Sequence, residues 1–221
     1  MAKKPQILKE IQNKELPEVN YAYQKTISYS QMSMYRGCPH KWELQYKEGH
    51  YNNDPNIHFT FGTSMHEVIQ DWLTVLYEES SLVADDMDLE GLFQEKFINL
   101  YQEEYKKFKN THYSSPEELR EFFEDGVAIL NFLQKKRSTY FSKRGRHLAG
   151  IELPIVMNVG NNLVYKGFID MVLYHEPTNK FYIYDIKTSR SGWNAKAKKD
   201  ETKQMQLVLY KKFFNEQYGI P

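Results

Sequence analysis

Cysteine is almost absent from this chain of 221 residues, in which Cys38 is the single one. No internal disulfide can form, and a reducing, cytoplasmic setting is the default expectation for such a composition. No apolar run approaches the roughly 20 residues that a membrane-spanning helix needs. The first residues also lack the apolar core of a signal peptide. We therefore expect a cytoplasmic protein that makes no contact with a membrane.

The chain has no net charge, because 29 lysines and arginines balance 29 aspartates and glutamates. The charges are nevertheless unevenly distributed. Glu78–Glu124 is rich in acid, whereas Lys135–Arg146 and Lys187–Lys212 are rich in base. Each basic stretch is either a solvated helix face or a surface that attracts a polyanion, and composition leaves both interpretations open.

The N-terminal third predicts a loose start followed by short helices. Residues 1–25 are polar and show no sustained period, which predicts a flexible N-terminal arm. The segment Ser28–Tyr46 predicts a short helix that begins at a serine cap, a break at Gly37–Pro39 and one further helical turn. Asn52–Asn56 is typical of a loop.

Three longer helices are expected next. Ser64 and Glu67 have the spacing of a capping box, which predicts a helix that begins at Ser64 and carries an apolar stripe beyond it. A second helix is expected from Asp88 to about Lys109. A third begins at Ser115, with Pro116 in its first turn.

The pattern changes from helical to extended after Gly145. Glu152–Val159, Leu163–Tyr174 and Phe181–Thr188 predict an antiparallel meander of three strands, joined by turns at residues 160–162 and 177–180. A basic loop, Ser189–Lys203, and a final helix follow. We therefore predict an α/β fold with a mixed sheet flanked by helices. It would form a single domain over residues 26–221, helical over 26–146 and carrying the sheet over 147–221.

Charged residues interrupt two of these apolar strands. If the turn between them is centred on Thr178 and Asn179, Asp170 lies directly opposite Lys187, and Asp185 lies diagonally across from Asp170. Opposite side chains are roughly 5 Å apart and diagonal ones about 7–8 Å apart. Two carboxylates and an ammonium would then converge on one face, which suits a divalent cation and its water.

An Asp-x-Lys sequence occurs by chance in many proteins. The alternative to a catalytic site is a buried Asp–Lys ion pair, which seldom stabilises a protein more than an apolar pair would. Function explains buried charges at the end of an apolar strand better than stability does.

Five motifs in order resemble the PD-(D/E)XK nuclease superfamily, in its RecB-type exonuclease branch, and together they cover Ser28 to Tyr210. That branch includes nuclease domains of recombination helicase–nucleases, CRISPR-adaptation exonucleases and phage exonucleases. The fold expected from the resemblance has a restriction-endonuclease-like core. The motifs are Ser30-Gln-Met-Ser-Met-Tyr-Arg-Gly-Cys-Pro39, Phe61-Gly-Thr-Ser-Met-His66, Gly167-Phe-Ile-Asp170, Asp185-Ile-Lys-Thr188 and Gln206-Leu-Val-Leu-Tyr210.

The resemblance implies a role for each matching residue. Asp170 and Asp185 would be catalytic and would bind Mg2+ or Mn2+, with the backbone carbonyl of Ile186 as a further ligand. Lys187 would orient or deprotonate the attacking water. His66 would be an additional metal ligand, although a lone histidine is more often an ordinary surface or core residue. Glu152 matches a family acidic position more loosely, and would either serve a second metal or be simply exposed.

The expected contacts with DNA are with its backbone and its bases. Gln206 and Tyr210 would lie near the scissile phosphate, although residues four apart on a helix face are common. Lysines of the basic loop would neutralise phosphates. These lysines are Lys196, Lys198, Lys199 and Lys203.

The function that the resemblance implies is metal-dependent hydrolysis of DNA, most simply by an exonuclease of recombination, repair or phage DNA metabolism. The substrate would be single-stranded DNA or duplex ends, with recombination or replication proteins as partners, in the cytoplasm or in a host cytoplasm. The alternatives are a structure-specific endonuclease and a non-catalytic DNA-binding or assembly module.

Two departures from the family pattern stand out. Some members hold an iron–sulfur cluster with four cysteines, and Cys38 matches only the first of them, so we expect no cluster. A further strand and helix usually follow the last motif, whereas this sequence stops at Pro221. We therefore expect either a truncated chain or a minimal member.

Overall fold

The computed structural model describes residues 4–188 and 194–220, apart from the side chains of residues 196, 197 and 203. The chain divides into two compact units. The first comprises residues 1–52, 147–185 and 189–221 and holds the sheet, whereas the second comprises residues 53–146 and 186–188 and is helical. The predicted change of character after Gly145 coincides with a boundary between the units, although residues 1–52 belong with the sheet.

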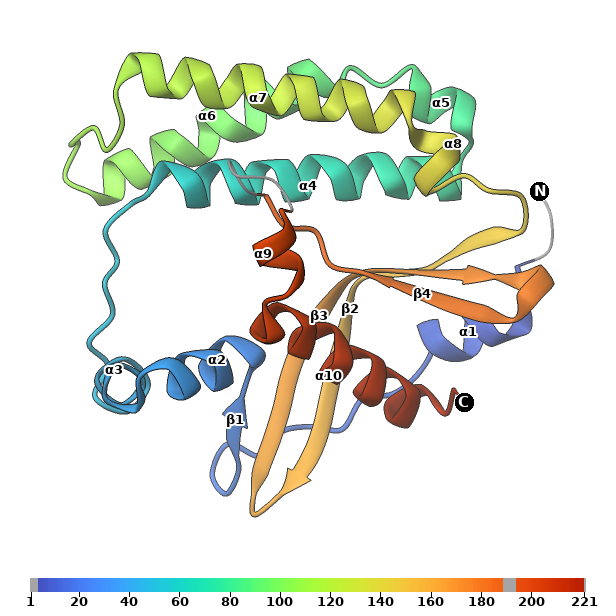
Figure 1. Cartoon of the computed structure of the whole chain (residues 1–221), viewed down its shortest axis with the longest axis horizontal. Helices are drawn as coiled ribbons and strands as arrows, with labels where there is room; N and C mark the ends of the chain where they lie inside the picture. The colour runs from blue at the N-terminus through green and yellow to red at the C-terminus, as the bar shows by residue number, and fades with distance from the viewer. Residues whose placement is uncertain (1–3, 189–193, 221) are drawn as a thin grey trace. The chain divides into compact units, whose positions relative to one another are not determined.

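A mixed sheet of four strands forms the first unit (Figure 1). Its central strand is β3 (Leu163–His175), which lies between β1 (Lys25–Ile27) and β2 (Arg146–Gly160). β1 runs parallel to β3, and β4 (Lys180–Tyr184) runs antiparallel to it. The predicted α/β class with a mixed sheet is confirmed.

The pairings of β1 and β4 cover different parts of β3. β1 pairs with Leu163–Tyr165, and β4 pairs with Met171–His175. In the described residues, Lys166–Asp170 lies between these two ladders and belongs to neither. The glycine and the aspartate of the Gly167–Asp170 motif therefore lie where the sheet changes partners.

The two turns of the meander are set by local chemistry. Asn161 and Asn162 have φ values of 49° and 59°, and two successive positive φ angles are typical of the tight type I′ turn. The second turn is a 3-10 helix, η2 (Glu176–Thr178), closed by Asn179 in the left-handed conformation. Pro177 takes the first central position of that turn, where its fixed φ is favoured.

This second turn corrects the predicted register. His175 pairs with Lys180 and Met171 pairs with Tyr184, so the turn is centred on Pro177 and Thr178, one residue earlier than predicted. The predicted pairing of Asp170 with Lys187 is therefore wrong. β4 also ends at Tyr184 rather than at Thr188, so Lys187 follows the strand instead of lying on it.

The predicted loop Ser189–Lys203 is partly helical. Residues 189–193 lie outside the described residues. The short helix α9 (Ala195–Lys198) comes next, and α10 (Glu201–Tyr218) begins two residues before the predicted loop would end. Asp200 caps α10 by accepting a hydrogen bond from the backbone N–H of Thr202 at 3.0 Å.

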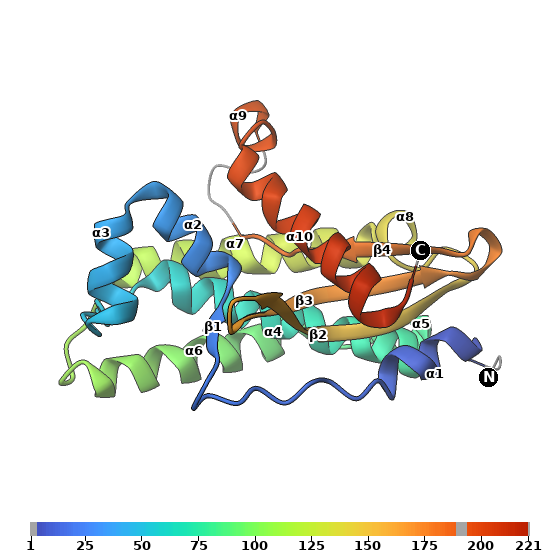
Figure 2. The same ribbon diagram turned by 90° about the horizontal axis from the view of Figure 1, so that it is seen from below.

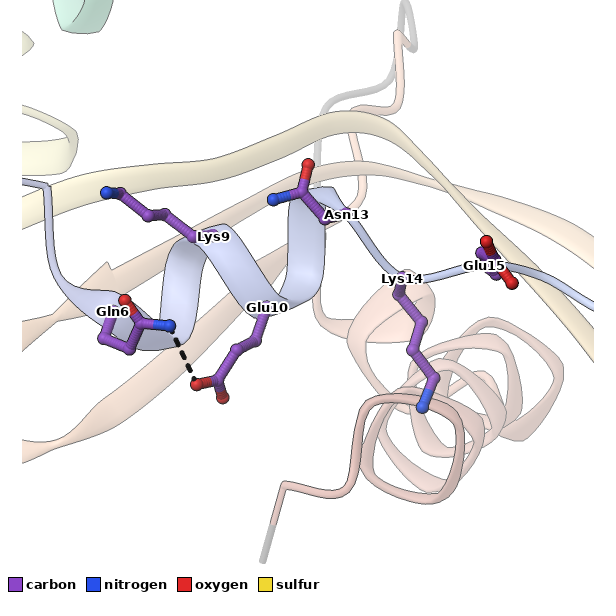
Figure 3. Close-up of a pocket in the computed structure, with 6 residues that line it drawn as sticks. All are labelled: Gln6, Lys9, Glu10, Asn13, Lys14 and Glu15. Atoms are coloured by element: carbon purple, nitrogen blue, oxygen red, sulfur yellow. Dashed lines mark hydrogen bonds between the residues drawn. The ribbon is translucent and has the colours of Figure 1, made fainter.

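The N-terminal segment differs from the flexible arm that we expected. Residues Gln6–Gln12 form helix α1, whose apolar face carries Leu8 and Ile11 into the core of the sheet unit. Figure 3 shows the polar side of this helix, where the Gln6 amide donates to Glu10 at 3.3 Å. The polar composition of the segment hid two buried residues spaced three apart, which is the spacing of one helix face.

Helix α10 packs lengthwise on the sheet (Figure 2). Phe213 contacts the ring of Tyr165 on β3, with centroids 4.6 Å apart, and Phe214 contacts Phe181 on β4 at 5.3 Å. At the end of the helix, Gln217 is buried and bonds to the backbone of β2. The core of the unit therefore lies between α10 and the sheet.

In the first unit, three short helices follow β1. They are α2 (Tyr29–Gly37), α3 (Pro39–Trp42) and a π-helix, η1 (Glu43–Lys47). The Ser28 hydroxyl caps α2, and Cys38 separates α2 from α3, as the sequence predicts. Cys38 also caps α3, through a contact of its sulfur with the N–H of Lys41.

The second unit contains three long helices and two short ones. The long helices are α4 (Ile57–Glu78), α6 (Leu89–Lys107) and α7 (Pro116–Lys135), and the short ones are α5 (Ser81–Asp85) and α8 (Arg137–Tyr140). The cap predicted at Ser115 is confirmed, and the helix predicted from Asp88 is capped by that residue. No helix among the described residues is long and apolar enough to cross a membrane.

The predicted start of α4 at Ser64 is wrong. The helix begins at Ile57 and is capped by Asn56, so Ser64 lies two turns inside it. There the Ser64 side chain is fully buried, and its hydroxyl donates to the carbonyl of Thr60 at 2.8 Å. A serine inside a helix can satisfy its hydroxyl on the preceding turn, which is why a capping-box pattern alone misleads here.

Replacing the buried Leu8 tests whether α1 belongs to the core. We expect Leu8→Ala to lower the free energy of unfolding by about 2–5 kcal/mol, because it leaves a cavity against the sheet. The exposed neighbour Lys9 is the control, and Lys9→Ala should change that free energy by less than about 0.5 kcal/mol. Urea denaturation measures both, and equal values for the two variants would contradict the packing of α1.

Candidate active site

Asp170 and Asp185 flank the ladder between β3 and β4. Asp170 directly precedes Met171, and Asp185 directly follows Tyr184, and these two neighbours are paired in the ladder. Asp170 is 9% exposed, whereas Asp185 is half-buried. The observed register thus brings the two aspartates to the same end of the ladder, in place of the aspartate and lysine that the sequence predicted.

Glu152 approaches the pair from β2 through an unusual backbone conformation. Its φ is 48° in the middle of a strand, although a residue other than glycine or asparagine is strained there. Two residues earlier, a Cβ on Gly150 would lie 2.8 Å from the Leu153 side chain, so the strand is locally kinked. One carboxylate oxygen of Glu152 and one of Asp170 lie within 4.8 Å of each other.

Helix α10 fixes the strand just beyond this kink. The Gln217 amide donates to the carbonyl of Pro154 at 2.8 Å, and its oxygen accepts from the N–H of Val156 at 2.7 Å. The Tyr218 hydroxyl donates to the same Pro154 carbonyl at 3.0 Å. Because the groups involved are largely buried, these bonds hold β2 firmly two residues after Glu152.

The charges of three acidic side chains act on Tyr210. The residue is 5% exposed, and its hydroxyl accepts a hydrogen bond from the Gln206 amide at 2.9 Å. Burial raises the pKa of Tyr210 to about 12, against the lowering effect of Gln206, and the negative charges of Asp185, Asp170 and Glu152 add to the rise. Three carboxylates therefore act on one buried hydroxyl, which stays protonated and can donate a hydrogen bond.

A second buried tyrosine lies beside it. The hydroxyl of Tyr165 has no hydrogen-bond partner among the described residues, and burial, followed by Tyr210 and Tyr29, raises its pKa. A Cβ on Gly167 would lie 3.3 Å from the Tyr165 hydroxyl and 3.5 Å from the Tyr210 ring. Gly167 leaves room for these two rings, which explains a glycine three residues before Asp170.

Within the second unit, the segment Ile186–Thr188 packs on α4. The Thr188 hydroxyl lies 3.2 Å from where a Cβ on Gly62 would stand, so Gly62 permits this close approach. His66 follows Gly62 by one helical turn and is half-buried. Lys187 is exposed.

The expected DNA contacts differ in their accessibility. Gln206 is half-buried and Tyr210 is buried, whereas Lys198 and Lys199 are exposed. The side chains of Lys196 and Lys203 lie outside the described part of the chain. Tyr165 and Gln217 were missed by sequence reasoning, and nothing in their local pattern distinguishes them from ordinary core residues.

The candidate donors of the sheet unit are carboxylate oxygens of Glu152 and Asp170, which lie within 4.8 Å of each other, and those of Asp185 at the end of the same ladder. Hard oxygen ligands of this kind suit Mg2+ and Mn2+, whereas thiolate and imidazole ligands suit softer metals. Carboxylates held close together repel one another unless a cation or protons neutralise them. The residues present therefore fit a divalent cation.

A family comparison agrees with this geometry. The family model of the PD-(D/E)XK nuclease superfamily matches residues 26–219, which include every residue of the site. No curated protein matches the chain. With nearly the whole chain matched, the protein belongs to the PD-(D/E)XK nuclease superfamily.

Proposed function

We propose that the protein is a Mg2+- or Mn2+-dependent deoxyribonuclease that hydrolyses phosphodiester bonds in DNA. The observation that carries the proposal is the approach of Glu152 to Asp170, within 4.8 Å, at the end of the ladder that Asp185 also flanks. Two carboxylates with oxygens within 4.8 Å of each other repel, so Glu152 and Asp170 are better explained by a bound cation than by stability alone. A divalent cation would both neutralise them and bind a phosphate.

The side chains of the site would have separate tasks. Asp170 and Asp185 would hold the cation, with Glu152 and the Ile186 carbonyl as further ligands. A bound cation supplies an acidified water and stabilises charge on the phosphate oxygens. Tyr210, which keeps its proton, would donate a hydrogen bond to an oxygen in the site, while the Gln206 amide holds its ring in place.

Lys187 and His66 would have the roles that their motifs imply. Lys187 would orient the attacking water and neutralise charge that grows on the phosphate in the transition state. His66 would be a further metal ligand. The packing of Thr188 at Gly62, one turn from His66, supports this role, because it brings the segment that follows Asp185 onto the same helix.

Within this activity, we favour an exonuclease of DNA recombination, repair or phage DNA metabolism, acting on single-stranded DNA or duplex ends. A structure-specific endonuclease on the same scaffold is the second candidate. Incubation with end-labelled linear DNA and with covalently closed circular DNA, in Mg2+, Mn2+ or EDTA, distinguishes the two. An exonuclease degrades the linear DNA and leaves the closed circle intact.

The two aspartates should be essential for cleavage. We expect Asp170→Asn and Asp185→Asn each to abolish metal-dependent cleavage while the thermal melting temperature without metal stays near that of the wild type. The exposed Asp86 is the control, and Asp86→Asn should cleave normally. Single-turnover cleavage of labelled DNA measures the effect. A loss of less than about tenfold, or ~1.4 kcal/mol in barrier, would exclude a two-aspartate site.

We expect Glu152 to destabilise the fold and to be needed for metal binding. Glycine accepts a φ of 48° without the strain of about 1–2 kcal/mol that other residues bear. We therefore expect Glu152→Gly to leave the free energy of unfolding unchanged or higher, while it weakens Mn2+ binding. Val159→Gly, at an exposed position of the same strand without a positive φ, should destabilise the fold.

Urea denaturation and a metal-titrated thermal shift test this pair of variants. A ligand that binds only the folded state raises its stability in proportion to the logarithm of ligand concentration over Kd. We expect the metal to raise the melting temperature less in Glu152→Gly than in the wild type, and as much in Val159→Gly as in the wild type. Equal metal-induced shifts in wild type and Glu152→Gly would remove Glu152 from the ligand set.

Lys187 and the exposed lysines Lys198 and Lys199 should affect different steps. We expect Lys187→Ala to slow single-turnover cleavage far more than it weakens DNA binding, because its charge acts mainly in the transition state. Lys198→Ala and Lys199→Ala should instead weaken binding and each reduce its salt dependence by about one phosphate contact. Salt-titrated binding beside single-turnover kinetics separates the two effects. Wild-type cleavage of bound DNA by Lys187→Ala would reassign that residue to the DNA contacts.

A further inference from the structure

The helices after β1 are unusually exposed for elements of a folded unit. Every residue of Tyr29–Lys47 is described, and none of them is buried in α2, α3 or η1. The segment is nevertheless rich in aromatic side chains, which normally contribute large apolar areas to a core. Figure 1 shows these helices in blue, beyond β1 in the chain.

Four of the aromatic rings form a continuous series, which we call the aromatic ladder. Tyr35 contacts Trp42 with centroids 5.4 Å apart, Trp42 contacts Tyr46 at 6.4 Å, and Tyr46 contacts Tyr51 at 6.1 Å. The first and last contacts are edge-on, with interplanar angles of 89° and 85°. The rings come from α2, α3, η1 and the loop that follows.

The two ends of the ladder are open to solvent. Tyr35 is 54% exposed and Tyr51 is 51% exposed, while Trp42 and Tyr46 are half-buried between them. Packing of the helices against each other explains the partial burial of the two inner rings. It does not explain two large rings at the ends that expose half their surface.

A cationic or imidazole side chain stands next to every ring in the sequence. Arg36 follows Tyr35, Lys41 precedes Trp42, Lys47 follows Tyr46 and His50 precedes Tyr51. Over residues 35–51 three lysines and arginines exceed two glutamates, and one of these, Glu43, binds Lys47 at 2.7 Å. The side chain of Arg36 is 59% exposed even though it lies 3.7 Å from Glu201.

Exposed rings that alternate with cations match one ligand chemistry well. Unpaired bases stack on aromatic faces whatever their sequence, and neighbouring cations neutralise the phosphates between them. A duplex hides its base faces and would gain only the charge contacts. The π-helix that carries Tyr46 adds to this, since such distortions often occur at functional sites.

We propose that the aromatic ladder binds single-stranded DNA by stacking bases on Tyr35 and Tyr51, with Arg36, Lys41 and Lys47 beside the phosphates. The proposal rests on the proposed nuclease function and specifies its substrate as DNA with an unpaired strand. α2 is joined to the helix of the candidate site, because the Tyr29 hydroxyl bonds to the carbonyl of Thr202 on α10. A strand held on the ladder would therefore be bound by the unit that carries the carboxylates.

The test measures binding without cleavage. In an Asp170→Asn background with EDTA, fluorescence anisotropy gives Kd for a labelled oligothymidylate and for a blunt duplex. Tyr35→Ala and Tyr51→Ala should each raise Kd for the oligothymidylate by at least about fivefold, because a stacked base contributes roughly 1 kcal/mol or more. Tyr35→Phe should bind normally because it keeps the ring.

Tyr23→Ala is the matched control, since Tyr23 is a 76% exposed tyrosine of the same unit outside the ladder. Melting temperatures equal to that of the parent confirm that the variants fold. Unchanged oligothymidylate binding in both ladder variants would overturn the proposal. So would an equal loss on the duplex, because binding would then not depend on unpaired bases.

The experiments distinguish failure of the aromatic ladder proposal from failure of the proposed nuclease function. If the ladder variants bind normally while Asp170→Asn alone stops cleavage, the ladder is excluded and the nuclease stands. If the ladder variants lose single-strand binding while the wild type cleaves no DNA in Mg2+ or Mn2+, the ladder stands and the nuclease is excluded.

Discussion

The packing of α10 on the sheet is the contact on which the candidate site depends. The helix places Phe213 and Phe214 in the core, and its last turn bonds to β2 through Gln217. The same packing buries Tyr210 among the acidic side chains. A buried amide that bonds to a strand backbone loses more when broken than it gains when formed, so it fixes position more than it adds stability. Two residues from that anchor, β2 can hold Glu152 in a strained conformation.

The site itself is a local conflict between stability and function. Glu152 has a left-handed backbone inside a strand, Asp170 is almost fully buried, and the Tyr165 hydroxyl has no partner in the described part of the chain. Each of these features is unfavourable by itself. They occur together in the candidate site, where the proposed cation would compensate the charges. The packing of the apolar core around them stabilises the fold and offsets these unfavourable features.

Several features of the fold were accessible to prediction, and the errors have physical reasons. Caps at Ser28 and Ser115 were found because side-chain capping is decided within one helical turn. The predicted register of β4 was wrong because the turn lies one residue earlier than expected. Pro177 and Asn179 favour a turn centred on Pro177 and Thr178, whereas the prediction centred it on Thr178 and Asn179. Ser64 was assigned to a cap although its hydroxyl bonds inside a helix. Leu8 and Ile11 were missed because two apolar residues in a polar segment carry too little periodicity to identify a buried helix face.

The sequence by itself determined the superfamily and the α/β class, because five short motifs in order are specific although each one alone is common. It also predicted the carboxylates of the site. Only the tertiary structure decided which groups meet. It paired Met171 with Tyr184, the neighbours of Asp170 and Asp185, and brought a carboxylate oxygen of Glu152 within 4.8 Å of one of Asp170. It also buried Tyr210 where the charges of all three residues raise its pKa. These relations depend on turn geometry and on the packing of α10, which begins 26 residues after the end of β3. Local sequence patterns encode neither, since contacts between distant segments are set by the core as a whole.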